Sequence, residues 1–197
     1  MAVICSDIKR MKLLLLFAIF FGDIVSALEE PEFRIVDKNS SFEIRHYNEY
    51  LVAEVTTGGD FTSSGNQAFR VLAGYIFGAN QATEKMAMTA PVLSSKDAGK
   101  HIYRFVMERK YTLDTLPIPD DDRIRLLKVE PRYMAVKLFS GRWSEKNYNK
   151  SEQQLLDDLY KNNIEIIGAP IFARYNAPFV PWFLRRNEVM IEINWSN

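Results

Sequence analysis

One order of structural signals occurs twice along the chain, and this repeat limits the folds that the sequence can adopt. A β-rich run that ends at Gly58 leads into a helical pattern and then to Pro91, and a run that ends at Gly141 leads into a second helical pattern and then to Pro170. The separations are similar, with Pro91 33 residues after Gly58 and Pro170 29 residues after Gly141. Two related units predict an α+β domain with pseudo-twofold symmetry, in which antiparallel strands form one curved sheet or distorted barrel and two helices pack against it.

Two segments carry apolar residues at helical spacing. The first predicts a helix over about residues 63–77, with Ser63 or Ser64 as its N-terminal cap. The second predicts a helix over about residues 144–162, with Ser144 as its cap. The two helices fall in corresponding places of the two units, as a repeat requires.

β-rich and alternating runs fill most of the remaining chain. The Pro- and Asp-rich residues 116–122 predict a loop between two halves, at about residues 31–115 and 123–194. The predicted strands are residues 42–47, 50–57, 86–93, 101–111, 124–129, 133–139, 164–167, 171–175 and 188–194. Residues 28–197 are therefore expected to form a single domain.

Residues 1–27 have the composition of a secretory signal peptide. Three basic residues within residues 9–12 precede an apolar run at residues 13–21, and small residues end at Ala27, where a signal peptidase would cut. The apolar core is shorter than the roughly 20 residues that span a bilayer. We therefore expect export, to the periplasm or the medium, with a retained N-terminal anchor as the alternative. Met11 is an alternative start, because the sequence that follows it is a compact signal by itself.

Charge and residue counts disfavour several functional classes. The chain has 25 basic and 25 acidic residues, without the basic surplus that nucleic-acid binding needs, so no nucleic-acid partner is expected. The single cysteine, Cys5, and the two histidines, His46 and His101, do not suffice for a zinc cluster of cysteines or several histidines. No nucleophile elbow, zinc-protease motif, phosphate-binding loop or dinucleotide fingerprint is present. The acid/base candidates for a hydrolase are Glu43, Glu54 and Glu84.

Several stretches resemble the SOUL family of haem-binding proteins, particularly its short bacterial-type members. They include FEIRHY at residues 42–47, KMAMTAPV at residues 85–92 and FLRRNEV at residues 183–189, and the resemblance covers about residues 31–194. It implies a distorted antiparallel β-barrel with two helices built from two repeats, and a tetrapyrrole ligand such as haem b. The chain is also similar to the effector-binding domains of bacterial drug-responsive regulators.

In some members of the family, the resemblance implies that the histidine of the EIRHY-type strand ligates the haem iron, and here that residue is His46. Its imidazole shares a face with Phe42 and Ile44 in an alternating strand and can donate a lone pair to iron. The alternative is a histidine whose hydrogen bonds serve the fold alone. His101, at the start of a later strand, is the weaker ligand candidate.

Two apolar segments could line a cleft for the ring. On the first helix, Phe69, Leu72 and Ile76 lie on one face, which would form a cleft wall or pack on the sheet. Residues 177–184 contain two prolines and yet hold Phe179 and Trp182, so this irregular segment must cover a core or a ligand. The next two residues, Arg185 and Arg186, suit haem propionates or a structural pair with Glu188 or Asp120.

The expected function is non-catalytic binding of haem or another porphyrin, for buffering or transport. The alternatives are an effector-binding module for other flat amphipathic molecules, and a hydrolase that uses the same cleft. A membrane contact is expected only through the signal segment, if it is not cleaved.

Overall fold

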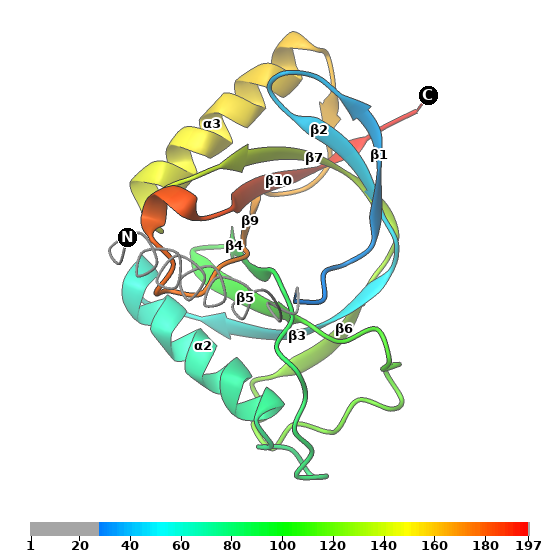
Figure 1. The fold of residues 1–197 in the computed structure, drawn as a ribbon, viewed down its shortest axis with the longest axis vertical. Helices are drawn as coiled ribbons and strands as arrows, with labels where there is room; N and C mark the ends of the chain where they lie inside the picture. Colours follow the sequence, from blue (N-terminus) through cyan, green and yellow to red (C-terminus); the bar gives the residue numbers. More distant parts are fainter. Residues whose placement is uncertain (1–27, 197) are drawn as a thin grey trace, which may run out of the picture.

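The computed structural model describes residues 28–196, which form one ten-stranded β-sheet and two α-helices. The sheet curls into an open barrel, and both helices lie outside it on the same side (Figure 1). The predicted signal peptide, residues 1–27, lies outside the described residues. Within residues 28–196, no helix has the length and hydropathy needed to span a bilayer.

The elements follow the predicted alternation of strands and helices. The helices are α2 (Phe61–Ile76) and α3 (Glu145–Lys161), and a 3-10 turn, η1, covers Trp182–Leu184. The strands are β1 (Phe33–Lys38), β2 (Glu43–Tyr47), β3 (Tyr50–Thr57), β4 (Val92–Asp97), β5 (Lys100–Val106), β6 (Arg125–Val129), β7 (Arg132–Phe139), β8 (Glu165–Ile166), β9 (Ile171–Arg174) and β10 (Asn187–Asn194).

Corresponding strands of the two halves lie at corresponding distances from the centre of the sheet. The central pair is β4 and β9; beyond β9 come β10, β7 and β2, and beyond β4 come β5, β3 and β6. Each half also contributes one strand to the other half's side of the sheet, because β2 pairs with β7 and β6 pairs with β3, all antiparallel. The predicted α+β fold class, a distorted antiparallel sheet with two helices and two pseudo-repeats, is confirmed. The residue limits of the domain and its halves stay a prediction.

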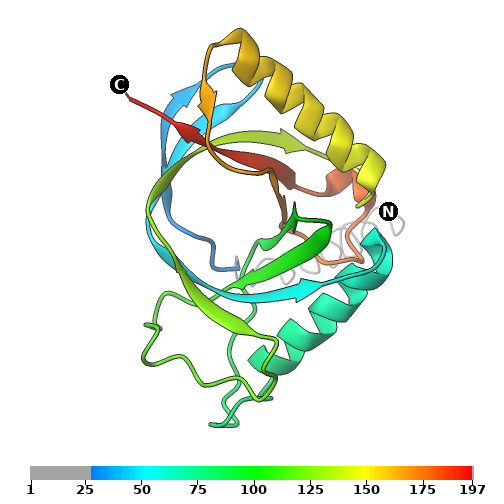
Figure 2. The ribbon, with the colours of Figure 1, turned by 180° about the vertical axis from the view of Figure 1, so that it is seen from behind.

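Both faces of the sheet are buried over much of its area. The inner core contains Val52, Met134 and Met190. Outside the barrel, α2 packs on β3 and β5 around Leu72, and α3 packs on β7 and β10 around Leu155. Seen from behind, the two helices again lie outside the curled sheet (Figure 2). Because β10 is buried on both faces, its apolar residues Val189, Met190 and Ile191 follow one another without alternating with polar ones.

The sequence predicted the N-terminal cap of α3 correctly but not that of α2. Ser144 caps α3 as predicted, and its hydroxyl accepts a hydrogen bond from the backbone N–H of Asn147 at 3.3 Å. The predicted cap of α2 is wrong, because the carboxylate of Asp60 accepts from the backbone N–H groups of Thr62 and Ser63 at 2.9 and 3.0 Å. A carboxylate placed before the first turn also complements the positive end of the helix dipole.

We expect Ser144→Ala to lower the free energy of unfolding by about 1 kcal/mol, because the first turn of α3 loses its side-chain acceptor. Urea unfolding followed by circular dichroism measures this loss. Thr62→Ala is the matched control, since Thr62 is exposed inside the first turn of α2 and only its backbone N–H takes part in the cap, and we expect it to change stability by less than about 0.5 kcal/mol. Equal losses in the two variants would contradict the assignment of the caps.

The predicted strand at residues 86–93 is shifted toward the C-terminus, the one at residues 101–111 ends early, and one strand was missed. The run from Met86 is irregular until β4 begins at Val92, since Pro91 has no N–H to donate to a ladder. In that run, the backbone N–H of Ala87 donates to the side chain of Glu108 instead of to another strand. β5 ends at Val106 and does not reach residue 111, and β1, which pairs only with β2, was not predicted.

Candidate functional site

A pocket of about 120 Å³ lies on the outer face of the sheet, between the N-terminal halves of α2 and α3. We call it the interhelix pocket. Ser94 of β4 and Phe172 of β9, which are partners in the central strand pair, both line it. The other lining residues are Phe61, Ser95, Lys96, His101, Tyr103, Glu145, Tyr148, Asn149, Glu152 and Pro170. The pocket therefore lies where the two halves of the domain meet.

Aromatic rings form much of the pocket wall. The ring of Tyr148 stacks on Phe172, with 4.5 Å between centroids and 13° between planes, and Phe61 meets Tyr148 edge-on at 5.5 Å. His101, the weaker ligand candidate, lies edge-on to Phe61 at 6.3 Å. Burial raises the pKa of the Glu152 carboxyl, which faces the same pocket. These walls suit a small aromatic molecule, and the pocket is too small for a whole tetrapyrrole ring.

Tyr148 differs from Tyr75 and Tyr175 in the hydrogen bonding of its hydroxyl. Tyr75 donates to the carbonyl of Pro117 at 2.8 Å, and Tyr175 donates to Glu188 at 2.7 Å. Tyr148 is only 1% exposed, and its hydroxyl has no hydrogen-bond partner among residues 28–196. Burial raises the pKa of Tyr148 to about 12. An unpaired buried hydroxyl is costly and is uncommon in native proteins.

Three arginines and two tryptophans lie next to the interhelix pocket, and we call them the arginine–tryptophan cluster. The guanidinium groups of Arg174 and Arg185 lie 5.4 and 4.2 Å from the ring centre of Trp143. Arg142 lies 5.7 Å from the ring centre of Trp182. The guanidinium of Arg174 also lies 5.9 Å from the ring centre of Tyr103, a residue of the pocket.

No carboxylate of the described chain forms an ion pair with Arg142, Arg174 or Arg185. The Nε–H of Arg174 is buried and has no hydrogen-bond partner among residues 28–196. The indole N–H of Trp143 donates to Asn187 at 2.9 Å and so fixes the ring between the two arginines. The cluster is thus a preformed positive site, which suits an anion from outside the chain.

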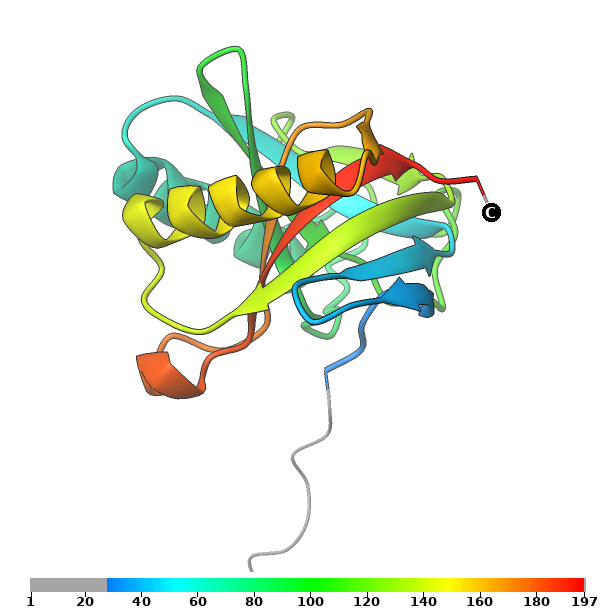
Figure 3. The ribbon, with the colours of Figure 1, turned by 90° about the horizontal axis from the view of Figure 1, so that it is seen from above.

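Residues 177–184, the apolar segment, leave large side chains in solvent. The exposed fractions are 87% for Phe179, 47% for Trp182, 58% for Phe183 and 65% for Leu184. Arg185 ties the segment to the cluster, because its guanidinium donates to the carbonyls of Pro178 and Val180 at 2.6 and 2.8 Å. Figure 3 shows η1, in orange-red, standing out from the body of the domain, far from the C-terminus of the chain. A contiguous apolar surface of this kind is typical of a binding site.

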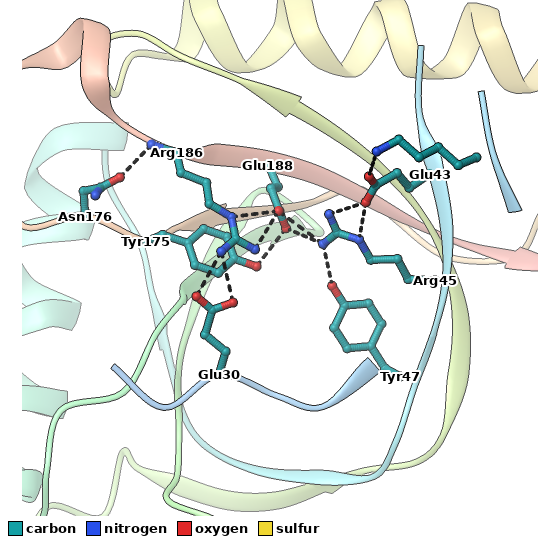
Figure 4. A network of polar contacts seen from close by, with 9 residues as sticks. Glu30, Glu43, Arg45, Tyr47, Tyr175, Asn176, Arg186 and Glu188 are labelled. Atoms are coloured by element: carbon teal, nitrogen blue, oxygen red, sulfur yellow. Dashed lines mark hydrogen bonds and ion pairs between the residues drawn. The ribbon is translucent and has the colours of Figure 1, made fainter. Parts of the chain in front are cut away.

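Arg186 does not join the cluster. It donates to Glu188 at 3.0 Å and to Glu30 at 2.9 Å, which is the structural pairing that the sequence offered as an alternative to propionates (Figure 4). Burial would lower the pKa of Arg186, but the nearby Glu188 carboxylate raises it overall. Arg186 is therefore already neutralised within the fold.

His46 lies on β2, away from the apolar segment. Its ring contacts Tyr133 of the neighbouring β7, with centroids 4.7 Å apart. Since side chains alternate along a strand, His46 points to the face opposite that of Arg45 and Tyr47, which reach the inside of the barrel. Figure 1 shows β2 and η1 on opposite sides of the domain. The structure thus does not bring His46 together with the other predicted site residues, and its role as an iron ligand stays a prediction.

The three predicted residues of α2 differ in exposure. Leu72 and Ile76 are 0% and 2% exposed and pack in the core beneath the helix. Phe69 is 48% exposed, and its ring lies edge-on to Phe105 at 5.5 Å. Of the three, Phe69 alone presents a large surface to an incoming molecule.

The carboxylates that a hydrolase would use are bound within the fold. Glu43 binds Lys38 and Arg45 at 2.8 and 2.7 Å, and Glu54 binds Arg104 at 2.7 Å. Glu84 accepts a hydrogen bond from Tyr111. None of the three lines the interhelix pocket. Among the described residues, no group of three or more His, Cys, Asp or Glu side chains could hold a metal ion.

Sequence reasoning missed most of the interhelix pocket and of the arginine–tryptophan cluster, including Arg142, Trp143, Tyr148 and Arg174. Alternation along β9 would have placed Arg174 on the same face as Phe172, two residues earlier. It could not have shown that the Nε–H of Arg174 lacks a partner, because that depends on every neighbour in the folded chain.

Comparison with known proteins yields one family and one fold. Residues 28–192 match the sequence model described as SOUL heme-binding protein. Heme-binding protein 2 of Mus musculus is 25% identical over 189 aligned residues, which cover 84% of this chain and 90% of that protein.

Two solved structures share the fold at low sequence identity. The C-terminal domain of EcmrR has a TM-score of 0.59 at 9% identity, with 82% of this chain and 98% of that chain covered. A hydrolase from Listeria innocua has a TM-score of 0.55 at 9% identity, with 81% and 94% covered. These two likenesses concern the fold alone.

Proposed function

Because the chain belongs to the SOUL heme-binding protein family, we propose that it binds haem or a related tetrapyrrole without changing it chemically. The family match supports a porphyrin ligand, and so does the similarity to the mouse protein, whose name states that it binds heme. We take haem b as the first ligand to test, and buffering or transport as the role.

We place the ring on the apolar segment. The observation that carries this placement is the exposure of Phe179, Trp182, Phe183 and Leu184 beside three arginines without a carboxylate partner in the described chain. A porphyrin has an apolar face and an edge with two carboxylates, so the ring would cover the apolar side chains while its edge met the arginines. Burial of apolar area would supply most of the affinity, and the charges would fix the orientation.

Export is part of this proposal. The signal-like residues 1–27 support it, and they also support the alternative of a retained anchor. An extracytoplasmic binder of this kind would take up haem outside the cytoplasm. Cell fractionation of the tagged protein, with N-terminal sequencing of the mature form, tests this part: an N-terminus near Leu28 supports it, and an intact N-terminus in the cytoplasm contradicts it.

Hemin titration of the purified protein, read by the Soret band, tests the placement of the ring. We expect a saturable one-to-one shift in the native protein, and an affinity at least roughly tenfold lower in a Phe179→Ser/Phe183→Ser double variant, which loses two apolar contacts. Tyr160→Ser is the matched control, because Tyr160 is an aromatic residue on α3 with 85% of its surface exposed. No saturable shift beyond that of an unrelated protein would refute haem binding.

His46→Ala decides between the two placements of the iron. If the ring lies on the apolar segment, this variant keeps the native affinity and the native Soret maximum. A large loss of affinity together with a shifted maximum would instead place the iron at β2, with His46 as its ligand, as the sequence predicts. Circular dichroism of the variant shows that any loss is not caused by unfolding.

The interhelix pocket favours a second candidate function, the binding of a small flat amphipathic molecule. Its stacked aromatic walls and the carboxylates of Glu145 and Glu152 are the observations that support it. Such a ligand would bind beside the tetrapyrrole surface, and the small aromatic probes described below test this function.

A further inference from the structure

Two buried polar atoms without a partner lie in the same part of the molecule. Within residues 28–196, the buried side-chain atoms without a hydrogen bond are the Nε of Arg132, the hydroxyl of Tyr148 and the Nε of Arg174. Arg132 has partners for its other nitrogens, in Glu192 and Tyr50. Arg174 has no ion pair, so Arg174 and Tyr148 form the unexplained pair.

These two residues are close through shared neighbours. Phe172 and Arg174 lie two residues apart on β9 and therefore share a face of the sheet. Tyr148 stacks on Phe172, and Arg174 lies over Tyr103, a lining residue of the interhelix pocket. Burial raises the pKa of the Tyr148 hydroxyl, and the guanidinium of Arg174 is close enough to oppose that rise. Both orphan groups thus belong to residues that lie where the interhelix pocket adjoins the arginine–tryptophan cluster.

The chemistry of the pair defines its ligand. An arginine Nε–H only donates, and a tyrosine hydroxyl whose pKa is raised stays protonated at neutral pH and can donate as well. The neighbouring Arg185 is held by Pro178, Val180 and Trp143. Two unpaired donors, one of them on the cationic Arg174, with the cation of Arg185 nearby, match a carboxylate, which accepts several hydrogen bonds and carries the opposite charge.

We propose that Arg174 and Tyr148 receive a carboxylate of the bound ligand and so select molecules that carry one. This inference rests on the proposed function for the identity of the ligand, a tetrapyrrole whose propionate would reach the junction from the apolar segment. The site itself rests on the two orphan donors. Arg174, and not Arg186, is then the residue that recognises the propionate.

Hemin and hemin dimethyl ester separate this inference from haem binding as such, because the ester keeps the ring and the iron but has no carboxylate. We expect the native protein to prefer hemin by roughly ten- to hundredfold, the range of a charged hydrogen bond. Arg174→Gln should remove that preference, and Tyr148→Phe should reduce it severalfold. Arg34→Gln is the matched control, since Arg34 is exposed on β1, and it should keep the preference.

Equal binding of hemin and its ester by the native protein would overturn the inference and leave haem binding intact. A preference that persists in Arg174→Gln would also overturn it. Thermal melts of all variants show whether they fold, and Tyr148→Phe is expected to fold because its hydroxyl has no partner to lose.

A second probe keeps the inference testable if hemin does not bind. The nitrogen-15 NMR signal of the Arg174 Nε–H is followed during titration with 2-naphthoate and, separately, with neutral 2-naphthalenemethanol. A shift with the carboxylate alone supports the site even without hemin binding. No shift with either compound, or equal shifts with both, refutes a carboxylate site at Arg174.

Discussion

Replacing Arg45 by methionine is expected to lower the free energy of unfolding by about 3–5 kcal/mol, the usual cost of removing one member of a buried charged network. The guanidinium of Arg45 is 3% exposed and lies inside the barrel. It donates to Glu43 at 2.7 Å, to Glu188 at 3.1 Å and to the hydroxyl of Tyr47 at 3.2 Å (Figure 4). Burial would lower the pKa of Arg45, but the Glu188 carboxylate raises it overall, so the charge is firmly held.

The cost arises because Glu188 stays behind. Its carboxylate is 0% exposed, and without Arg45 it keeps Arg186 and Tyr175 as partners. We therefore expect the double variant Arg45→Met/Glu188→Gln to lose less stability than the sum of the two single variants, a coupling that a double-mutant cycle measures.

Urea unfolding at pH 7 gives all four free energies of the cycle. Lys128→Met is the control, because Lys128 is exposed and pairs with Glu49 at the surface, where such pairs contribute at most about 1 kcal/mol. If Arg45→Met cost no more than this control, the network would not stabilise the fold.

The curled sheet could be predicted because its signals are local. The positions of Gly58, Gly141 and the two prolines mark the same step in each half, and Ser144 precedes its helix directly. The pair of Arg186 and Glu188 was also within reach, since Arg186 directly precedes β10 and the two residues are only two positions apart.

The remaining contacts could not be predicted because they join distant parts of the chain. Arg45 and Glu188 are 143 residues apart, and Glu30 and Arg186 are 156 apart. Both faces of β2 and β10 are buried, so alternation did not show which side chains point into the barrel. For the same reason, Phe42 and Ile44, which share a face of the strand with His46, did not imply a cleft. They pack in the core beneath α3.

Alkaline pH is expected to unfold the domain steeply above about pH 10, because burial raises the pKa values of four tyrosines. Burial raises the pKa of Tyr75 and of Tyr148 to about 12, and it raises the pKa values of Tyr47 and Tyr175 further. Between pH 10 and pH 12 the unfolded chain loses these protons while the folded chain keeps them. The raised pKa therefore favours the folded state fully below pH 10, and that contribution is lost as the pH rises through the folded values.

The slope follows from the number of retained protons. Each tyrosine contributes about 1.4 kcal/mol per pH unit, so four contribute roughly 5 kcal/mol per pH unit, against a usual domain stability of about 5–15 kcal/mol. Urea unfolding at pH 9, 10 and 11, together with tyrosinate absorbance near 295 nm, measures it. Tyr148→Phe isolates one group, because its hydroxyl has no hydrogen bond to lose within the described chain. We expect that variant to be at least as stable as the native protein at pH 7, because it removes an unpaired buried hydroxyl, and to reduce the slope by about a quarter. An unchanged slope would show that these hydroxyls are open to solvent. So would tyrosinate absorbance before unfolding that exceeds what the other five tyrosines, such as the 85% exposed Tyr160, can give.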